Sequence, residues 1–266
     1  MKLAITGKGG VGKTTLTSLL AYHYAEHGRT VLAIDADPSP CLGAALGFPP
    51  EVLARLEPIA AMQDLISERT GAQPGALGSY FKLNPRVDDI PDRFAVTHGG
   101  IRLLELGAVE QGGSGCICPE SVLLKQLVSH ILLRRDEVVL MDMYAGVEHL
   151  GRATAEAVDA LFVVVEPSAR SLATAAQIKR LASDLHLRRL WLVGNKVRTD
   201  EDRRYIEAHT PDLPVLGHLP YAPEAQAAEQ AGLDVYHAVP AMRAAARAIA
   251  AAAADALEST PQHLPA

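Results

Sequence analysis

The chain has 266 residues, of which 48% are hydrophobic and 21% are charged, and its formal net charge is −6. This composition is ordinary for a folded globular protein and excludes a long disordered chain. The negative charge gives no support to sequence-independent binding of nucleic acid, and three cysteines are too few for a disulfide framework.

Short runs of Val, Ile and Leu alternate along the chain with segments of helical length. This alternation is typical of a mostly parallel sheet with helices on both faces, so we expect one doubly wound α/β domain over residues 1–258. An irregular insertion is expected at 49–100 and a frayed tail at 259–266. Strands are predicted at 2–6, 30–35, 101–107, 137–142, 160–166, 189–194 and 214–219. The best marked helices are predicted at 13–27, 121–133, 168–185 and 240–257.

No apolar run in the sequence is long enough to span a bilayer, and the first residues lack the apolar core of a signal peptide. We therefore expect a cytoplasmic protein without a membrane anchor.

The first predicted strand runs directly into the segment GKGGVGKTT, residues 7–15. This segment has the spacing of a phosphate loop, in which glycines let backbone amides wrap the phosphates of ATP or ADP. Lys13 reaches the β and γ phosphates, and Thr14 can ligate Mg²⁺. A chance glycine-rich turn is the alternative, which the strand and helix on either side disfavour. The predicted nucleotide contacts are Gly7, Lys8, Gly9, Gly10, Val11, Gly12, Lys13, Thr14 and Thr15.

Carboxylates follow two other predicted strands, at the edge of the sheet where ligands of such folds bind. Asp35 and Asp37 follow the second strand, and Asp142 ends the run EVVLMD. Asp142 is predicted to reach Mg²⁺ through water, and a carboxylate at 35–37 can position the attacking water or hold a magnesium-bound one. A helix N-cap is the alternative for Asp35 and Asp37.

Asn195 and Lys196 end a further predicted strand at the same edge. The Asn195 amide is predicted to read the adenine edge, while the stem of Lys196 packs on the ring. A chance Asn-Lys turn is the alternative.

Cys116 and Cys118 lie one residue apart, just before a predicted helix. Structural metal sites usually take four ligands, and this segment offers two, so a two-fold dimer would complete the site. Four thiolates suit either Zn²⁺ or Ni²⁺. Two small packed residues are the alternative, and Cys41, which has no partner motif, is expected to be packed.

The loop with its early Lys8 resembles the deviant Walker A motif of the MinD, ParA and nitrogenase iron protein class. More specific segments resemble the CooC-type ATPases that mature nickel carbon monoxide dehydrogenases. These segments are Asp-Ala-Asp-Pro at 35–38, Gly-Cys-x-Cys-Pro-Glu at 115–120, DMYAGVEHLGRAT at 142–154, and Asn195-Lys196. The resemblance covers residues 1 to about 221.

This resemblance implies a P-loop NTPase fold and a homodimer that is closed by ATP, with Lys8 contacting nucleotide across the interface. It implies an ATPase that is slow without its partner, with Lys8, Lys13 and Asp37 in the catalytic site. Asp37 would position water, and Asp35 would be its structural or magnesium-side neighbour. It further implies nickel held by the cysteine pairs and delivered to an apo carbon monoxide dehydrogenase-like client. Tyr144 stands where an acidic residue is expected in this family.

Two other functions remain open at this level. One is a MinD- or ParA-like positioning ATPase, although residues 258–266 are too short and proline-rich for an amphipathic anchor. The other is an iron–sulfur carrier or reductase of the nitrogenase iron protein type, with four thiolates holding a four-iron cluster.

Overall fold

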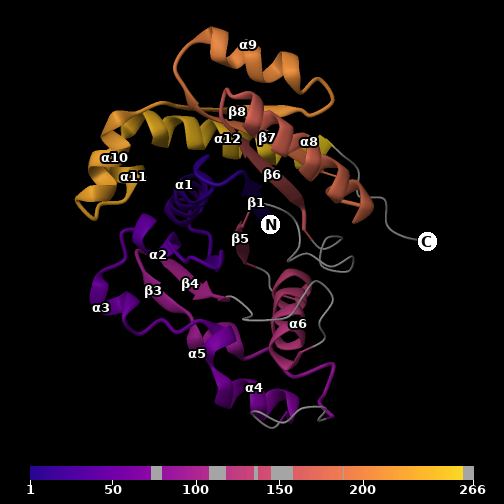
Figure 1. Cartoon of the computed structure of the whole chain (residues 1–266). Helices are drawn as coiled ribbons and strands as arrows, with labels where there is room; N and C mark the ends of the chain where they lie inside the picture. The colour runs from indigo at the N-terminus through magenta and orange to yellow at the C-terminus, as the bar shows by residue number, and fades with distance from the viewer. Residues whose placement is uncertain (73–79, 108–117, 135–136, 145–157, 188, 260–266) are drawn as a thin grey trace.

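The computed structural model describes residues 1–72, 80–107, 118–134, 137–144, 158–187 and 189–259. Within these residues the strands form one sheet in the order β3-β4-β2-β5-β1-β6-β7-β8 (Figure 1). Neighbouring strands are parallel except β3 and β4, which are antiparallel. The predicted doubly wound α/β fold is confirmed. The strands are β1 (Lys2–Gly7), β2 (Val31–Ala36), β3 (Val96–His98), β4 (Ile101–Glu105), β5 (Val138–Met143), β6 (Ala160–Val165), β7 (Leu190–Val197) and β8 (Val215–Pro220).

Helices cover both faces of this sheet (Figure 1). One face packs against α1 (Lys13–Glu26), α2 (Leu42–Ala45), α11 (Val235–Ala238) and α12 (Pro240–Ser259). The other face packs mainly against α4 (Gln63–Thr70), α6 (Pro119–Arg134) and α8 (Ala169–Asp184). The central strands are therefore buried on both sides, as their continuous apolar runs require. The remaining helical elements are α3 (Pro50–Leu53), η1 (Ile59–Ala61), α5 (Ile90–Phe94), α9 (Asp200–His209) and α10 (Pro223–Gln230).

The strand order reverses at β1, which lies between β5 and β6. Parallel sheets of this kind bind ligands outside the carboxyl ends of the strands at such a switch point. The glycine-rich segment that follows β1 therefore emerges at the position in the fold where a ligand is expected.

The helix boundaries follow local signals in the sequence. Helix α1 ends before Gly28, whose φ of +71° suits glycine, and α6 begins at Pro119. The N-cap Ser168 of α8 accepts a hydrogen bond from the Ser171 amide. Thr199 and Asp202 form a capping box at the start of α9.

The insertion at 49–100 contains short helices and also β3, which was not predicted. This edge strand pairs with β4 through Gly99 and Gly100, whose φ angles are +56° and +77°. Two consecutive residues with positive φ are typical of a type I′ hairpin turn, and the Gly-Gly pair was the signal for it.

No helix in the described part of the chain is both long and apolar enough to cross a membrane.

Candidate functional site

The segment 7–15 joins β1 to α1 as a tight loop that two glycines make possible. A Cβ atom on Gly7 would lie 2.4 Å from the carbonyl oxygen of Val164, so only glycine allows β6 this close. Gly12 has a φ of +96°, and a Cβ there would lie 2.1 Å from Nδ2 of Asn195. The loop is thus pressed between the carboxyl ends of β6 and β7.

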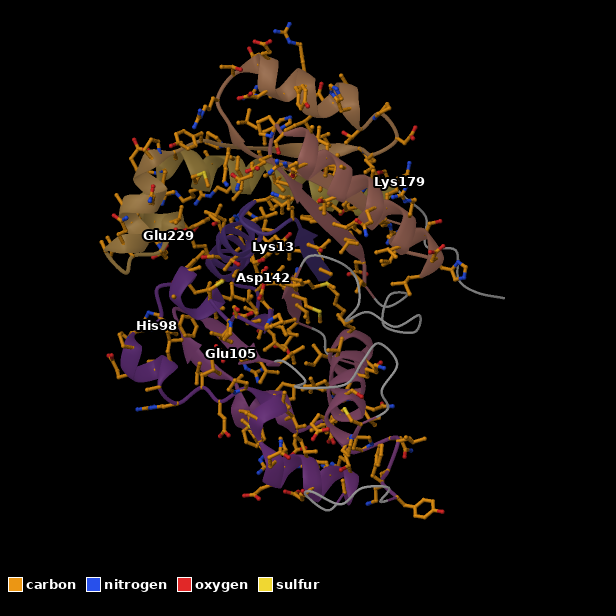
Figure 2. The ribbon with its side chains drawn as sticks, viewed as in Figure 1. Lys13, His98, Glu105, Asp142, Lys179 and Glu229 are labelled. Atoms are coloured by element: carbon orange, nitrogen blue, oxygen red, sulfur yellow. The ribbon has the colours of Figure 1, made fainter. Side chains whose placement is uncertain are left out.

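Two donors converge inside this loop on the carbonyl oxygen of Lys8. The Val11 amide donates to it over 3.4 Å and the Lys13 ammonium over 3.5 Å. Both distances are longer than a good hydrogen bond, so both donors can exchange this acceptor for a charged one. Since Lys13 is only 7% exposed, its ammonium is held at the base of the loop, near Asp142 (Figure 2). This arrangement is suited to a phosphate group.

Thr14 and Asp142 are brought together from opposite parts of the chain. The Thr14 hydroxyl donates to Oδ2 of Asp142 over 2.6 Å. The other carboxylate oxygen, Oδ1, is buried and has no hydrogen-bond partner among the described residues. Burial is the main reason why the pKa of Asp142 rises to about 7. A hydroxyl beside an unpartnered carboxylate oxygen offers the hard oxygen ligands that Mg²⁺ takes, so these residues fit the predicted magnesium site.

Asp35 lies at the same register position as Asp142 on the neighbouring strand, and it is 1% exposed. Its Oδ2 accepts from the amides of Cys41 and Leu42 over 2.9 and 2.8 Å, and its Oδ1 accepts from the Asp37 amide over 3.1 Å. These bonds order the turn that leads into α2. Asp35 is therefore positioned as the structural neighbour of the site, whereas a magnesium contact stays a prediction.

Asp37 is half-buried at the carboxyl edge of β2, and its Oδ1 accepts from the Ser39 amide over 2.9 Å. It lies two residues after Asp35, and its role in positioning water stays a prediction.

Asn195 and Lys196 contact the loop itself. Asn195 is 5% exposed, and its amide donates to the carbonyl oxygen of Val11 over 2.7 Å. Its Oδ1 accepts from the Lys196 amide over 2.8 Å. The Lys196 ammonium donates to the carbonyl oxygen of Gly10 over 2.7 Å. In this structure the two side chains therefore bind the backbone of the loop, and their predicted contacts with adenine stay a prediction.

The cysteines occupy two separate places. Cys116 lies outside the described residues. Cys118 is half-buried and immediately precedes α6, where its carbonyl oxygen accepts from the Ser121 hydroxyl over 3.0 Å. Within the described residues, no cluster of three or more Cys, His, Asp or Glu side chains could hold a metal ion.

The expectation that Cys41 is packed was wrong. Cys41 is exposed, and its Sγ lies 3.5 Å from Oγ1 of Thr14. It lies in the turn between β2 and α2 at the carboxyl edge of the sheet, where ligands of such folds bind. Cys41 follows Pro38 by three residues, which was a signal for its place at this edge but not for its exposure.

Two functional candidates were missed: Glu105, which ends the apolar strand β4, and Glu166, which follows the apolar strand β6. Glu105 lies at the same register position as Asp35, on the side of Asp35 that is away from Asp142 (Figure 2). Burial is the main cause that raises the pKa of Glu105 to about 7, and the charge of Asp35 adds to it. Glu166 follows β6 and accepts from the Lys196 ammonium over 3.1 Å.

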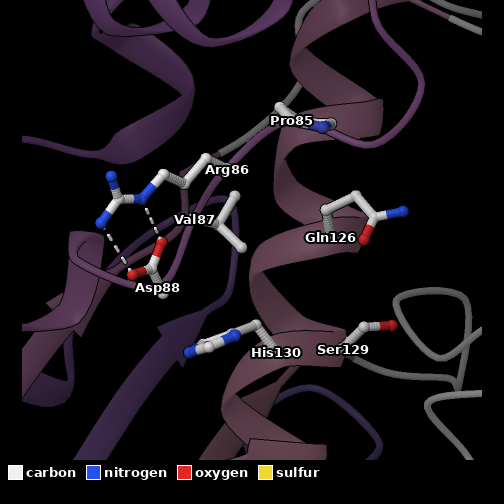
Figure 3. A pocket seen from close by; sticks show the side chains of 7 residues that line it. All are labelled: Pro85, Arg86, Val87, Asp88, Gln126, Ser129 and His130. Carbon is white, nitrogen blue, oxygen red and sulfur yellow. Dashed lines mark hydrogen bonds and ion pairs between the residues drawn. The ribbon is translucent and has the colours of Figure 1, made fainter.

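A separate hollow lies between residues 85–88 and α6 (Figure 3). Its wall includes the ion pair of Arg86 with Asp88, whose two hydrogen bonds measure 2.7 and 3.0 Å, and His130 from α6. The lining contains no residue of segment 7–15, so this hollow is distinct from the phosphate loop.

A glycine-rich loop at the switch point, with a buried lysine and a threonine–aspartate pair, defines a P-loop nucleotide-binding protein. The chain belongs to the CobQ/CobB/MinD/ParA nucleotide binding domain family, whose model matches residues 2–235.

Sequence relatives support a narrower grouping. The chain is 50% identical over 252 residues to "Carbon monoxide dehydrogenase accessory protein CooC" of Rhodospirillum rubrum, covering 95% of each chain. It is 46% identical over 238 residues to an uncharacterized ATP-binding protein of Methanocaldococcus jannaschii, covering 88% of this chain and 91% of the relative. The resemblance to CooC-type ATPases is confirmed.

Solved structures agree on the fold. The MinD cell division protein of Aquifex aeolicus superimposes with a TM-score of 0.65 at 22% identity, covering 97% of this chain and 98% of that one. This likeness extends along the whole chain and supports the assignment of the fold.

We expect the stability of the ligand-free protein to fall as pH rises from about 4.5 to about 7, in part because of Glu105. Its pKa is higher in the folded state, so in this range the folded protein binds more protons than the unfolded chain does. Glu105→Gln should therefore flatten the pH dependence of the free energy of unfolding, measured by chemical denaturation. Glu229→Gln, at an exposed position on α10, is the control and should leave the wild-type slope (Figure 2). Identical slopes for wild type and Glu105→Gln would contradict the assignment.

Proposed function

We propose that the protein is an ATP-hydrolysing, dimeric metallochaperone that supplies nickel to a carbon monoxide dehydrogenase-like enzyme. The observation that carries this proposal is 50% identity over 95% of the chain to a carbon monoxide dehydrogenase accessory protein. The Cys-x-Cys-Pro-Glu segment provides the thiolates that such a task requires. Its proposed location is the cytoplasm, where thiols stay reduced, and neither nucleic acid nor a membrane is a proposed partner.

Nucleotide binding in this proposal begins with the inward donors of the phosphate loop. The Val11 amide and the Lys13 ammonium, now weakly bound to the Lys8 carbonyl oxygen, turn to the phosphates. Lys13 places a positive charge beside the β and γ phosphates at a position where little water competes with it. The loop therefore fixes the triphosphate before chemistry takes place.

Thr14 and Asp142 would hold Mg²⁺, the first through its hydroxyl and the second through Oδ1 or a bridging water. The ion supplies charge neutralisation at the phosphates when it is bound. Asp37, half-buried at the end of β2, would orient the attacking water. Phosphoryl transfer asks the protein mainly for such positioning, so no covalent role is assigned to any side chain.

The metal cargo would be held by Cys116 and Cys118 together with the same pair of a second copy, in either the nickel or the zinc form. A two-fold interface presents one surface twice, so two thiolates per chain become four per dimer. Cys118 is half-buried and lies directly before α6, a helix of 16 residues, so a regular element of the fold positions this thiol.

The hydrolysis assignment can be tested with two substitutions in the nucleotide site. Lys13→Ala should remove most binding of magnesium ATP, because the main positive charge in the loop is lost. Asp37→Asn should keep binding but slow hydrolysis by a factor on the order of 100, the scale of losing a positioning group. Steady-state phosphate release and equilibrium nucleotide binding measure the two effects. Wild-type hydrolysis in both variants would refute the proposal.

Lys8 tests closure of the dimer separately from nucleotide binding. Its charge should meet the partner's phosphates only in the closed dimer, so Lys8→Ala should bind nucleotide as a monomer nearly as well as wild type. Dimerisation induced by a nonhydrolysable ATP analogue should weaken, as measured by sedimentation velocity. An undiminished dimer would show that Lys8 is an ordinary surface residue.

Stoichiometry tests the cysteine site, since four thiolates from two chains predict one metal ion per dimer. Cys116→Ser and Cys118→Ser each leave two sulfurs in the dimer and should abolish tight binding of Ni²⁺ or Zn²⁺ in titration calorimetry. ATP hydrolysis should persist in both variants. Cys41→Ser is the matched control and should bind metal normally. One metal per monomer, or normal binding after either substitution, would exclude an interface site.

A further inference from the structure

Consecutive residues of β7 both reach the phosphate loop, which a regular strand does not allow. Neighbouring side chains in a strand point to opposite faces. The pairing of β7 with β8 shifts between Gly194 and Val197, and Lys196 has a φ of +57°. Such an irregularity redirects side chains locally. As a result Asn195 and Lys196 each donate to a carbonyl oxygen of the loop.

The two acceptors are consecutive in the chain, the carbonyl oxygens of Gly10 and Val11. A peptide group is planar, with its N–H opposite its C=O. Holding these two carbonyls on the β7 side therefore turns the amides of Val11 and Gly12 the other way. For Val11 this is the side where its amide meets the Lys8 carbonyl oxygen, together with the Lys13 ammonium. Consecutive amides turned to one side form an anion-binding nest.

Glu166 holds the Lys196 ammonium, which is the donor to the Gly10 carbonyl oxygen. Its Oε2 accepts from Lys196 over 3.1 Å, and its Oε1 accepts from the Ser168 hydroxyl over 3.3 Å. Ser168 is itself the N-cap of α8. The pair is therefore anchored to a helix terminus on one side and to the loop on the other, although the Lys196 side chain is partly exposed.

We propose that Asn195, Lys196 and Glu166 form a brace that orients the amides of the phosphate loop, and that Lys196 acts on phosphate affinity without contacting the base. The brace rests on the proposed binding of nucleotide at this loop and names the positioning residues for it. The effect of the brace on affinity requires no adenine, because the brace acts by orienting the backbone of Gly10 and Val11. A base contact by Lys196 would instead require adenine.

A ligand without a base separates these two roles. Equilibrium binding of inorganic tripolyphosphate and of magnesium ATP would be measured on the full chain, for wild type, Lys196→Met, Lys196→Arg and Glu166→Gln. Lys179→Met is the matched control. The Lys179 ammonium bonds to Asp212 over 3.2 Å with its side chain 42% exposed, compared with 44% for Lys196, and it lies on α8 away from the loop (Figure 2).

We expect Lys196→Met to weaken both ligands by the same factor, about tenfold or more, as the loss of one charge-assisted hydrogen bond typically does. Lys196→Arg keeps a donor and should recover most of the affinity for both, whereas Lys179→Met should match wild type. Glu166→Gln should weaken both ligands equally but less, and it carries the test if thermal melting shows that Lys196→Met does not fold.

Three results would overturn the brace. Loss of ATP binding with normal tripolyphosphate binding would assign Lys196 to the base. If Lys196→Met and Glu166→Gln bind both ligands as tightly as Lys179→Met does, the Lys196–Glu166 pair is an ordinary surface contact. If Lys196→Arg folds but does not recover affinity, the inference that donation to the Gly10 carbonyl oxygen supports phosphate binding is wrong. If the wild-type protein binds neither ligand, the proposed function fails. If the wild-type protein binds both ligands and the variants bind them equally well, only the brace fails.

Discussion

The close approach of the phosphate loop to the ends of β6 and β7 is the constraint on which the rest of the site depends. The loop can pass there only because Gly7 and Gly12 lack side chains, with Val164 and Asn195 occupying the space a Cβ would need. This contact fixes the start of α1 and with it Thr14, which then meets Asp142 from β5. Loss of either glycine would displace the loop from both strands, so it would disturb phosphate and magnesium ligands together.

The carboxyl edge of the sheet also carries an electrostatic cost. Glu105, Asp35 and Asp142 occupy one register position on β4, β2 and β5, and burial raises the pKa of each. The backbone amides of the turn before α2 compensate Asp35, but Oδ1 of Asp142 has no such partner in the described part of the chain. A fold does not retain an unpartnered buried carboxylate oxygen for stability, so its presence favours a cation as the missing partner.

Features that depend on local sequence signals could be predicted, whereas features that depend on tertiary contacts could not. The strands other than β3 were predicted because each is a short apolar run that alternates with segments of helical length. The phosphate loop, Asp142 and their proximity followed from motif spacing and strand topology. The exposure of Cys41 and the attachment of Lys196 to Gly10 could not be predicted. They depend on the tertiary position of the turn after β2 and on an irregularity in β7, and neither of these changes the apolar pattern of the sequence. Glu105 could have been predicted as a site residue, because it ends an apolar run of the sequence as Asp142 does.

The course of the chain joins the nucleotide edge to the proposed metal ligands. β4 ends at Glu105, beside Asp35, and after residues 106–117 the chain arrives at Cys118 and α6. Leu123 and Leu127 of α6 are fully buried, so the helix that follows Cys118 is packed on the sheet whose edge carries the phosphate loop. If metal and ATP both favour the closed dimer, each must raise the affinity for the other by the same factor, because coupling between binding sites is reciprocal. In the proposed dimer, hydrolysis would then lower the affinity for the metal by removing one of the two ligands that favour closure, which requires no contact between nucleotide and metal.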